Sequence, residues 1–325
     1  MNDLSIPRRT LGPDGPPVGA LGLGCMGMSW AYSPDDRDEQ RSRSVIRRAV
    51  EIGVTLLDTA DVYGPYSNEQ LIGEALDGLR ARAVLSTKCG LEVRSIDPLE
   101  LVRNGRPEHV RRAIDGSLQR LRTDCVDLYQ LHRTDPDVPL EETWGAMAEI
   151  VAAGKARAIG MSEATVAELD RAQAVHPVAS LQSELSLWER GPLDSGVLRW
   201  CERHGAAFMA YSPLGRGYLT GAVSYDDLGA GDVRRDTPRF TRETMARNTR
   251  ILERVRAVAT RHGATGAQVA LAWLLAQSEC VVPIPGTRRI ERLEENARAA
   301  LLSLSEEELA ELDDLPAPAG ERFRV

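Results

Sequence analysis

The chain has 325 residues, of which 42% are hydrophobic and 27% charged, a composition typical of a globular protein with a full core. Its net charge of -8 argues against a nucleic-acid-binding protein, which needs a basic face. No uninterrupted apolar run is long enough to span a membrane, and the first ten residues lack the apolar centre of a signal peptide. The five cysteines are scattered without metal-ligand spacing. We therefore expect a cytoplasmic protein with no metal site and with no nucleic-acid or membrane partner.

Short runs rich in apolar and β-branched residues alternate with longer amphipathic stretches along the whole chain. The alternation occurs eight times, which predicts a parallel sheet, and eight parallel strands can close into a barrel. We expect an α/β fold, a (β/α)8 (TIM) barrel with extra C-terminal helices, as a single domain over residues 1–325. The expected strands are Val18–Met28, Thr55–Ala60, Ala83–Lys88, Cys125–His132, Ala156–Ser162, Val178–Leu185, Ala207–Pro213 and Cys280–Gly286.

Several segments carry signals beyond this alternation. The first eighteen residues contain turn-forming glycines and prolines and are expected to form a hairpin that plugs the bottom of the barrel. The segment Leu214–Arg242 is too long for a simple connection and is a candidate lid. The pairs Ser67/Gln70 and Thr165/Glu168 have the spacing of helix capping boxes.

A doubly wound dinucleotide-binding sheet is the alternative fold. Residues 22–27 match the pattern Gly-x-Gly-x-x-Gly, which binds a dinucleotide when a helix opens on the last glycine. Here a loop follows Gly27, and the helical pattern begins only near Ser42. In addition, no tyrosine is followed by a lysine four residues later, the usual signature of short-chain dehydrogenases. The barrel is therefore the favoured fold.

Titratable residues stand at successive strand ends of the predicted barrel. Asp58 follows the second strand, Lys88 ends the third and His132 ends the fourth, while Tyr63 lies in the loop after Asp58. In barrel enzymes the C-terminal ends of the strands form the active site. Each residue alone also fits a structural role, but the four together indicate a site. Lys88 is notable because the chain has only one other lysine, Lys155, and arginine supplies nearly all of its positive charge.

With these residues in order, the chain resembles the aldo-keto reductase family over essentially its whole length. The matching motifs are Asp58-Thr59-Ala60-Asp61-Val62-Tyr63-Gly64, Ser86-Thr87-Lys88, Asp127-Leu128-Tyr129-Gln130-Leu131-His132, Gly160-Met161-Ser162, Gln182, Tyr211-Ser212-Pro213-Leu214 and Ile284-Pro285-Gly286-Thr287-Arg288, continuing to Arg292 and Glu295-Asn296.

The resemblance implies an NADPH-dependent oxidoreductase that reduces an aldehyde or ketone to an alcohol. Tyr63 would be the general acid, Lys88 would lower its pKa, Asp58 would hold Lys88, and a neutral His132 would orient the carbonyl oxygen. Asp61 is a second acid in the same loop, but the family pattern assigns the role to Asp58. Two arginines four residues apart, Arg288 and Arg292, suit the 2′-phosphate of NADPH. The residues implied in cofactor binding are Ser162, Gln182, Tyr211, Ser212, Leu214, Arg216, Gly286, Thr287, Arg288, Arg292, Glu295 and Asn296.

Two points leave alternatives open. Many relatives carry asparagine directly after the serine that corresponds to Ser162, whereas this chain has Glu163. An ionised glutamate accepts hydrogen bonds but does not donate them. The alternative function is a cofactor-binding regulatory or scaffold barrel with little turnover, while a metal-dependent hydrolase is disfavoured because the five histidines show no ligand spacing. The oligomeric state and the carbonyl substrate stay undefined. Trp30, Tyr32, Tyr66, Trp188 and the tail Pro316–Val325 are candidates to contact the substrate.

Overall fold

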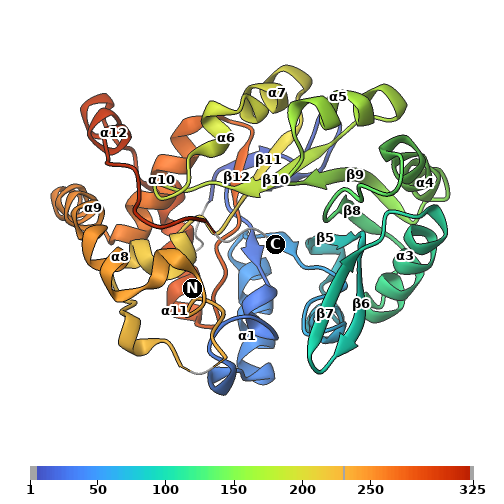
Figure 1. The fold of residues 1–325 in the computed structure, drawn as a ribbon, viewed down its shortest axis with the longest axis horizontal. Helices are drawn as coiled ribbons and strands as arrows, with labels where there is room; N and C mark the ends of the chain where they lie inside the picture. Colours follow the sequence, from blue (N-terminus) through green and yellow to red (C-terminus); the bar gives the residue numbers. More distant parts are fainter. Residues whose placement is uncertain (1–5, 230, 323–325) are drawn as a thin grey trace.

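The computed structural model describes residues 6–229 and 231–322, and its centre is one sheet of eight parallel strands (Figure 1). The strand order is β12-β11-β10-β9-β8-β5-β4-β3. Each strand falls within or overlaps one of the eight runs expected from the sequence, so the (β/α)8 prediction is confirmed. The strands are β3 Leu23–Gly24, β4 Leu56–Asp58, β5 Val84–Cys89, β8 Val126–Leu131, β9 Ala156–Ser162, β10 Ser180–Glu184, β11 Ala207–Tyr211 and β12 Val281–Pro283.

The first and last strands of the sheet meet and close the barrel. The backbone N–H of Gly22 donates to the carbonyl of Pro283 at 2.9 Å, and that of Gly24 donates to Pro285 at 3.2 Å. A Cβ atom on Gly24 would lie 2.8 Å from the carbonyl oxygen of Ile284, so only glycine fits there. The glycines that suggested a dinucleotide-binding turn therefore belong to a strand contact, and the doubly wound alternative is wrong.

Helices surround the sheet, as Figure 1 shows. Each parallel strand is followed by at least one helix, which returns the chain to the start of the next strand. The helices that follow the strands in turn are α1 Glu39–Glu51, α2 Ser67–Ala75, α3 Pro107–Leu121, α4 Leu140–Ala152, α5 Val166–Val175, α7 Val197–His204, α10 Gly266–Gln277 and α11 Ile290–Arg298. Further helices are α6 Gly191–Asp194, α8 Arg242–Arg247, α9 Thr249–Arg261 and the expected C-terminal addition α12 Glu306–Asp313. Short 3₁₀ turns are η1 Met26–Met28, η2 Pro34–Asp36, η3 Arg80–Arg82, η4 Gly215–Thr220, η5 Tyr225–Asp227, η6 Pro238–Phe240 and η7 Ala299–Leu301.

The expected N-terminal hairpin is present in the described residues. Strand β1 (Arg8–Thr10) pairs antiparallel with β2 (Pro17–Gly19). Leu11 and Val18 are buried in the same apolar cluster as side chains of the barrel strands, so the hairpin plugs the barrel as predicted. Residues 1–5 of this segment lie outside the described residues.

One of the two capping boxes forms. The Thr165 side chain accepts from the N–H of Glu168, and the Glu168 carboxylate accepts from the N–H of Thr165, so this prediction is confirmed. The box predicted for Ser67 is wrong, because the Ser67 hydroxyl donates to the carbonyl of Gly64 at 2.7 Å. Tyr66, in the left-handed region at φ 68°, precedes the helix instead.

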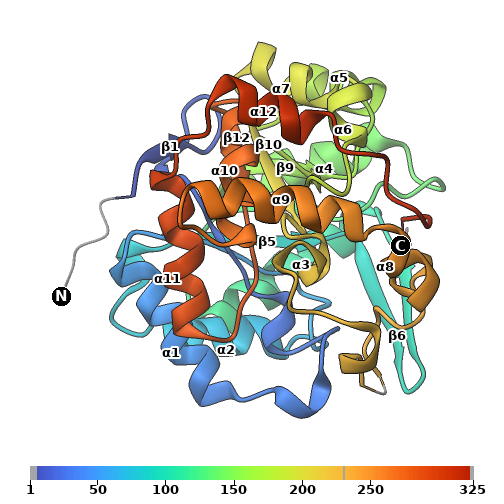
Figure 2. The same ribbon diagram turned by 90° about the vertical axis from the view of Figure 1, so that its left-hand side faces the viewer.

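A second hairpin was not expected from the sequence. Strands β6 (Leu91–Ile96) and β7 (Leu99–Arg103) pair antiparallel between β5 and α3, and Figures 1 and 2 show them standing away from the main sheet. At the base of the hairpin, Leu91 is buried in the same apolar cluster as Tyr63. Within the described residues, no helix is long and apolar enough to cross a membrane.

Candidate active site

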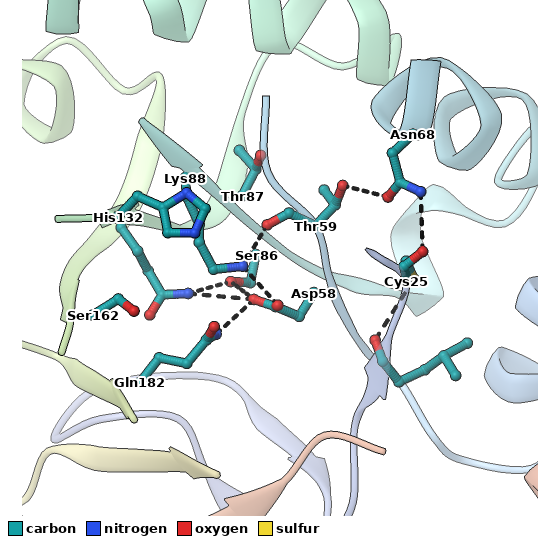
Figure 3. Close-up of polar contacts among 12 residues, drawn as sticks. Cys25, Asp58, Thr59, Asn68, Ser86, Thr87, Lys88, His132, Ser162 and Gln182 are labelled. Atoms are coloured by element: carbon teal, nitrogen blue, oxygen red, sulfur yellow. Dashed lines mark hydrogen bonds and ion pairs between the residues drawn. The ribbon is translucent and has the colours of Figure 1, made fainter. Parts of the chain in front are cut away.

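A buried ion pair lies at the centre of the site. Lys88, near the end of β5, places its ammonium 2.7 Å from a carboxylate oxygen of Asp58, the last residue of β4, and 2.6 Å from the carbonyl oxygen of Thr59 (Figure 3). Lys88 is 0% exposed and Asp58 is 3% exposed. A lysine without accessible surface keeps its charge only when a partner compensates for the lost water. Asp58 supplies that compensation, as the sequence led us to expect.

The second oxygen of Asp58 is held by a network that sequence reasoning missed. Ser86 donates to it at 2.9 Å and Gln182 at 2.8 Å, and Gln130 donates to Ser86 at 2.8 Å (Figure 3). Ser86 and Gln130 are fully buried strand residues. The sequence did contain a signal for this network, because Ser86 and Gln130 stand two positions before Lys88 and His132. Alternate residues of a strand point to the same side, so these polar side chains share a side with the predicted catalytic residues.

Tyr63 lies between Lys88 and His132. The Lys88 ammonium is 5.2 Å from the centre of the Tyr63 ring, and the His132 ring meets Tyr63 edge-on at 5.9 Å between centroids. Trp30 covers another side of the phenol, with its ring centre 5.6 Å away. The structure thus brings together all four residues predicted for catalysis.

Burial sets the protonation of these groups. Burial raises the pKa of Tyr63 above its usual value, and the nearby Lys88 only partly opposes this, so the net direction is opposite to the one expected from the sequence. Burial, followed by the charges of Lys88 and Arg133, lowers the pKa of His132 well below its usual value. At neutral pH the Tyr63 phenol is therefore protonated and the His132 imidazole, edge-on to it, is neutral. The buried Nδ1 of His132 has no hydrogen-bond partner among the described residues.

Asp61 is buried but lies apart from the ion pair. Its carboxylate accepts from the N–H of Val62 at 2.7 Å. Burial and the neighbouring Glu69 raise its pKa well above the usual range. The Lys88 ammonium donates to Asp58 and not to Asp61 in the contacts of the described residues, in agreement with the role expected for Asp58.

The residues predicted to contact the nicotinamide lie in β9, β10 and β11. The Ser162 hydroxyl, at the end of β9, accepts from Arg133 at 3.2 Å. Gln182, in β10, donates its amide N–H to Asp58. The Tyr211 hydroxyl, at the end of β11, accepts from Arg322 of the C-terminal tail at 2.7 Å. These side chains line one side of the barrel mouth, next to the ion pair.

The segment after Tyr211 begins with strained backbone and then reaches the loop after β3. Ser212 and Arg216 have positive φ values of 48° and 55°. Leu214 packs against the core, and a guanidinium nitrogen of Arg216 lies 3.8 Å from Glu184. Further along the segment, which is described except for residue 230, Asp232 accepts from the N–H of Ser33 at 3.2 Å. The candidate lid thus bridges to the loop after β3.

The residues predicted for the adenosine end lie after β12. Gly286 packs so closely that a Cβ atom would lie 2.9 Å from the carbonyl oxygen of Gly24. Thr287 accepts from the N–H of Arg289 at 3.2 Å. In α11, Glu295 pairs with Arg292 at 2.8 Å, and Asn296 is buried.

Arg288 differs from the expectation. It precedes α11, which begins at Ile290, so Arg288 and Arg292 do not share a helix face. The Arg288 guanidinium instead pairs with Asp36 at 3.1 Å and donates to the carbonyl of Ser33 at 3.2 Å. The prediction of a helical two-arginine face is therefore wrong, although both arginines lie at the same end of α11.

Two of the proposed substrate-contacting aromatics point elsewhere. Trp188 is only 2% exposed and stacks on Tyr218 at 4.3 Å between ring centres. Tyr66 is exposed, and its ring lies under the guanidinium of Arg120 at 4.8 Å. Trp30 lies beside Tyr63, with 5.6 Å between the ring centres, and the Tyr32 ring lies under the guanidinium of Arg234 at 5.1 Å.

Comparison with known proteins agrees with this arrangement. The sequence profile described as the Aldo/keto reductase family matches residues 20–317. The chain belongs to the aldo/keto reductase family. A probable aldo-keto reductase 1 from Glycine max is 41% identical over 313 residues, which cover 96% of this chain and 89% of that protein.

Solved aldo/keto reductase structures share the fold. The glycerol dehydrogenase from Gluconobacter oxydans is 29% identical, with a TM-score of 0.85 and complete coverage of both chains. An aldo-keto reductase from Klebsiella pneumoniae, solved in complex with NADPH, is 28% identical over 97% of each chain, with a TM-score of 0.73. Membership in the family makes this chain an oxidoreductase. No group of three potential metal-ligating side chains occurs among the residues the structure describes.

Proposed function

We propose that this aldo/keto reductase uses NADPH to reduce an aldehyde or ketone and that Tyr63 donates the proton. The observation that carries the proposal is the fully buried Lys88, paired with Asp58 and positioned 5.2 Å from the Tyr63 ring. A buried ion pair beside a phenol has no structural necessity, because two apolar side chains of similar size in place of both partners often fill a core at equal or lower free-energy cost. Its chemical use is to stabilise the phenolate that remains after proton transfer.

The protonation states of Tyr63 and His132 fit the proposed transfer of a proton from Tyr63 to the carbonyl oxygen. Because burial keeps the pKa of Tyr63 above its usual value, the phenol carries its proton at neutral pH and is ready to act as an acid. As negative charge develops on a carbonyl oxygen, Tyr63 protonates that oxygen and Lys88 stabilises the phenolate. The neutral His132 presents a buried Nδ1 without a partner. A neutral imidazole donates through one nitrogen, so His132 can orient the same oxygen without competing as a proton source.

The described residues also fit a phosphorylated nicotinamide cofactor. The ring of Tyr211 offers a flat surface at the end of β11, on the side of the barrel where Ser162 ends β9 and Gln182 lies in β10. At the other end, α11 begins without a side-chain cap, and its free N–H groups together with Arg288 and Arg292 suit a phosphate. When bound, NADPH supplies the hydride. Ser212, Leu214, Arg216, Gly286, Thr287, Glu295 and Asn296 are the remaining residues proposed to hold it.

The proposal is tested by following loss of NADPH absorbance with a panel of aldehydes and ketones. The Tyr63→Phe variant removes the proton donor and should lower kcat by about 10²–10⁴-fold. Tyr66→Phe is the matched control, because Tyr66 lies in the same loop but is exposed, with its ring under the guanidinium of Arg120. NADPH binding without turnover of any carbonyl compound by the unmodified protein would overturn the proposal in favour of a regulatory barrel.

A further inference from the structure

A C-terminal arginine joins the ends of three neighbouring strands. Arg322 donates from Nε to the carboxylate of Glu184 at 2.7 Å and from Nη2 to the hydroxyl of Tyr211 at 2.7 Å. The same Nη2 lies 2.8 Å from a carboxylate oxygen of Glu163. Glu163 directly follows β9, Glu184 ends β10 and Tyr211 ends β11. All three partners therefore lie on the side of the mouth proposed for the nicotinamide.

The segment before Arg322 is held against the rest of the protein by hydrogen bonds at Ala319 and Gly320. Ala319 exchanges two hydrogen bonds with the Asn248 side chain, at 2.7 Å and 3.1 Å. Arg239 donates to the carbonyl of Gly320 at 3.1 Å and also to the carbonyl of Trp188. Figure 1 shows the chain leaving α12 at the periphery and running toward the middle of the ring. These hydrogen bonds thus position Arg322 next to the ends of β9, β10 and β11.

Glu163 is turned toward this arginine. Its other carboxylate oxygen accepts from the Ser183 hydroxyl at 2.9 Å and from the N–H of Glu184 at 3.0 Å. The pair with Arg322 helps to hold the pKa of Glu163 below its usual value, so both partners are charged at neutral pH. Glu184, in turn, faces Arg216 as well as Arg322. Glu163 and Glu184 therefore lie beside Tyr211 together with the guanidinium groups of Arg322 and Arg216. Arg133 adds a further positive charge near the Tyr211 hydroxyl.

We propose that Arg322 and Glu163 form an ion pair that positions Tyr211 and sets the charge beside the nicotinamide, and so the preference between reduced and oxidised cofactor. The inference rests on the proposed function, because it requires a nicotinamide on Tyr211. The oxidised ring carries a positive charge and the reduced ring is neutral. A positive charge near the ring therefore weakens binding of NADP⁺ more than binding of NADPH, and a negative charge does the reverse.

The charges predict opposite effects for the two partners. Arg322→Met removes one positive charge from this group and should lower the ratio Kd(NADP⁺)/Kd(NADPH) by on the order of tenfold in a partly screened site. Glu163→Gln removes one negative charge and should raise the same ratio by a similar factor. Arg322→Lys keeps the charge and should keep the ratio within about twofold of the original.

The experiment measures both dissociation constants by protein fluorescence, without turnover. Arg171→Met is the matched control, because Arg171 pairs with Glu141 on the outer helices with both side chains exposed, and it should leave the ratio unchanged. A purely structural role for Arg322 would weaken both cofactor forms equally. An unchanged ratio in Arg322→Met and Glu163→Gln, with NADPH turnover intact, would overturn this inference alone. Failure of the unmodified protein to bind either form would overturn the proposed function together with it.

Discussion

Replacing Lys88 with methionine should cost the protein several kcal/mol of unfolding free energy. Methionine fills a similar volume but leaves the Asp58 carboxylate, 3% exposed, without its cation. At the observed separation of 2.7 Å, the attraction between the two charges is about 6 kcal/mol with an effective dielectric constant of ~20. Ser86 and Gln182 still donate to Asp58 in the variant and offset part of this loss. We expect a net cost of about 3–5 kcal/mol, the usual cost of breaking a buried pair.

The assay is thermal or denaturant unfolding followed by circular dichroism. For a chain of this size, about 4 kcal/mol corresponds to a fall in Tm of about 6 °C. Lys155→Met is the matched control, because Lys155 is the other lysine of the chain and pairs with Asp115 at the surface. This control should change stability by less than about 1 kcal/mol.

The pair itself is isolated by a double-mutant cycle. Adding Asp58→Asn to Lys88→Met removes the unpaired charge, and the double variant should be more stable than the sum of the single effects predicts by about 2 kcal/mol or more. Equal losses of stability in Lys88→Met and Lys155→Met would refute the reasoning. So would strict additivity of the Lys88 and Asp58 substitutions.

Three further predictions concern protonation and the barrel seam. Because burial lowers the pKa of His132 in the folded protein, the unfolded chain binds more protons than the folded protein below pH ~6.5. The free energy of unfolding should therefore decrease as the pH is lowered below ~6.5. The His132→Gln variant should lack this part of the pH dependence. The imidazole NMR signals of His132 should not titrate near neutral pH, and a normal titration would contradict the buried neutral ring. Gly24→Ala should destabilise the protein because its Cβ meets the carbonyl of Ile284 at 2.8 Å, whereas Gly145→Ala, which has open space in α4, should stabilise it by about 0.5–1 kcal/mol in denaturant unfolding.

The barrel strands could be predicted because they are short runs of mostly buried residues. Val126–Leu131 is an uninterrupted buried run in the structure, and a parallel sheet covered on both faces requires such a sequence. The hairpin of β6 and β7 escaped prediction because its residues are mixed, with exposed positions such as Ile96. The order of strand ends likewise predicted that Asp58, Lys88 and His132 would converge.

Other parts of the site depend on contacts between residues far apart in the chain. The bond from Arg322 to Tyr211 joins residues separated by 111 positions, and no local pattern indicates it. The direction of the Tyr63 pKa shift was also beyond the sequence, because it depends on how completely the phenol is buried. Arg288 was misjudged because the start of α11 was not predicted, and the helix-face argument failed with that boundary.

The seam between Gly24 and Gly286 has a consequence for synthesis of the protein. The two residues that complete the cylinder are separated by nearly the whole chain, so the nascent sheet keeps an open edge until β12 has emerged from the ribosome. At a synthesis rate of about 5–20 residues per second, roughly 13–50 s pass between the synthesis of β3 and that of β12. Exposed strand edges invite pairing with other chains, and very short edge strands limit that hazard. At two residues, β3 is short enough to protect the nascent chain during this interval.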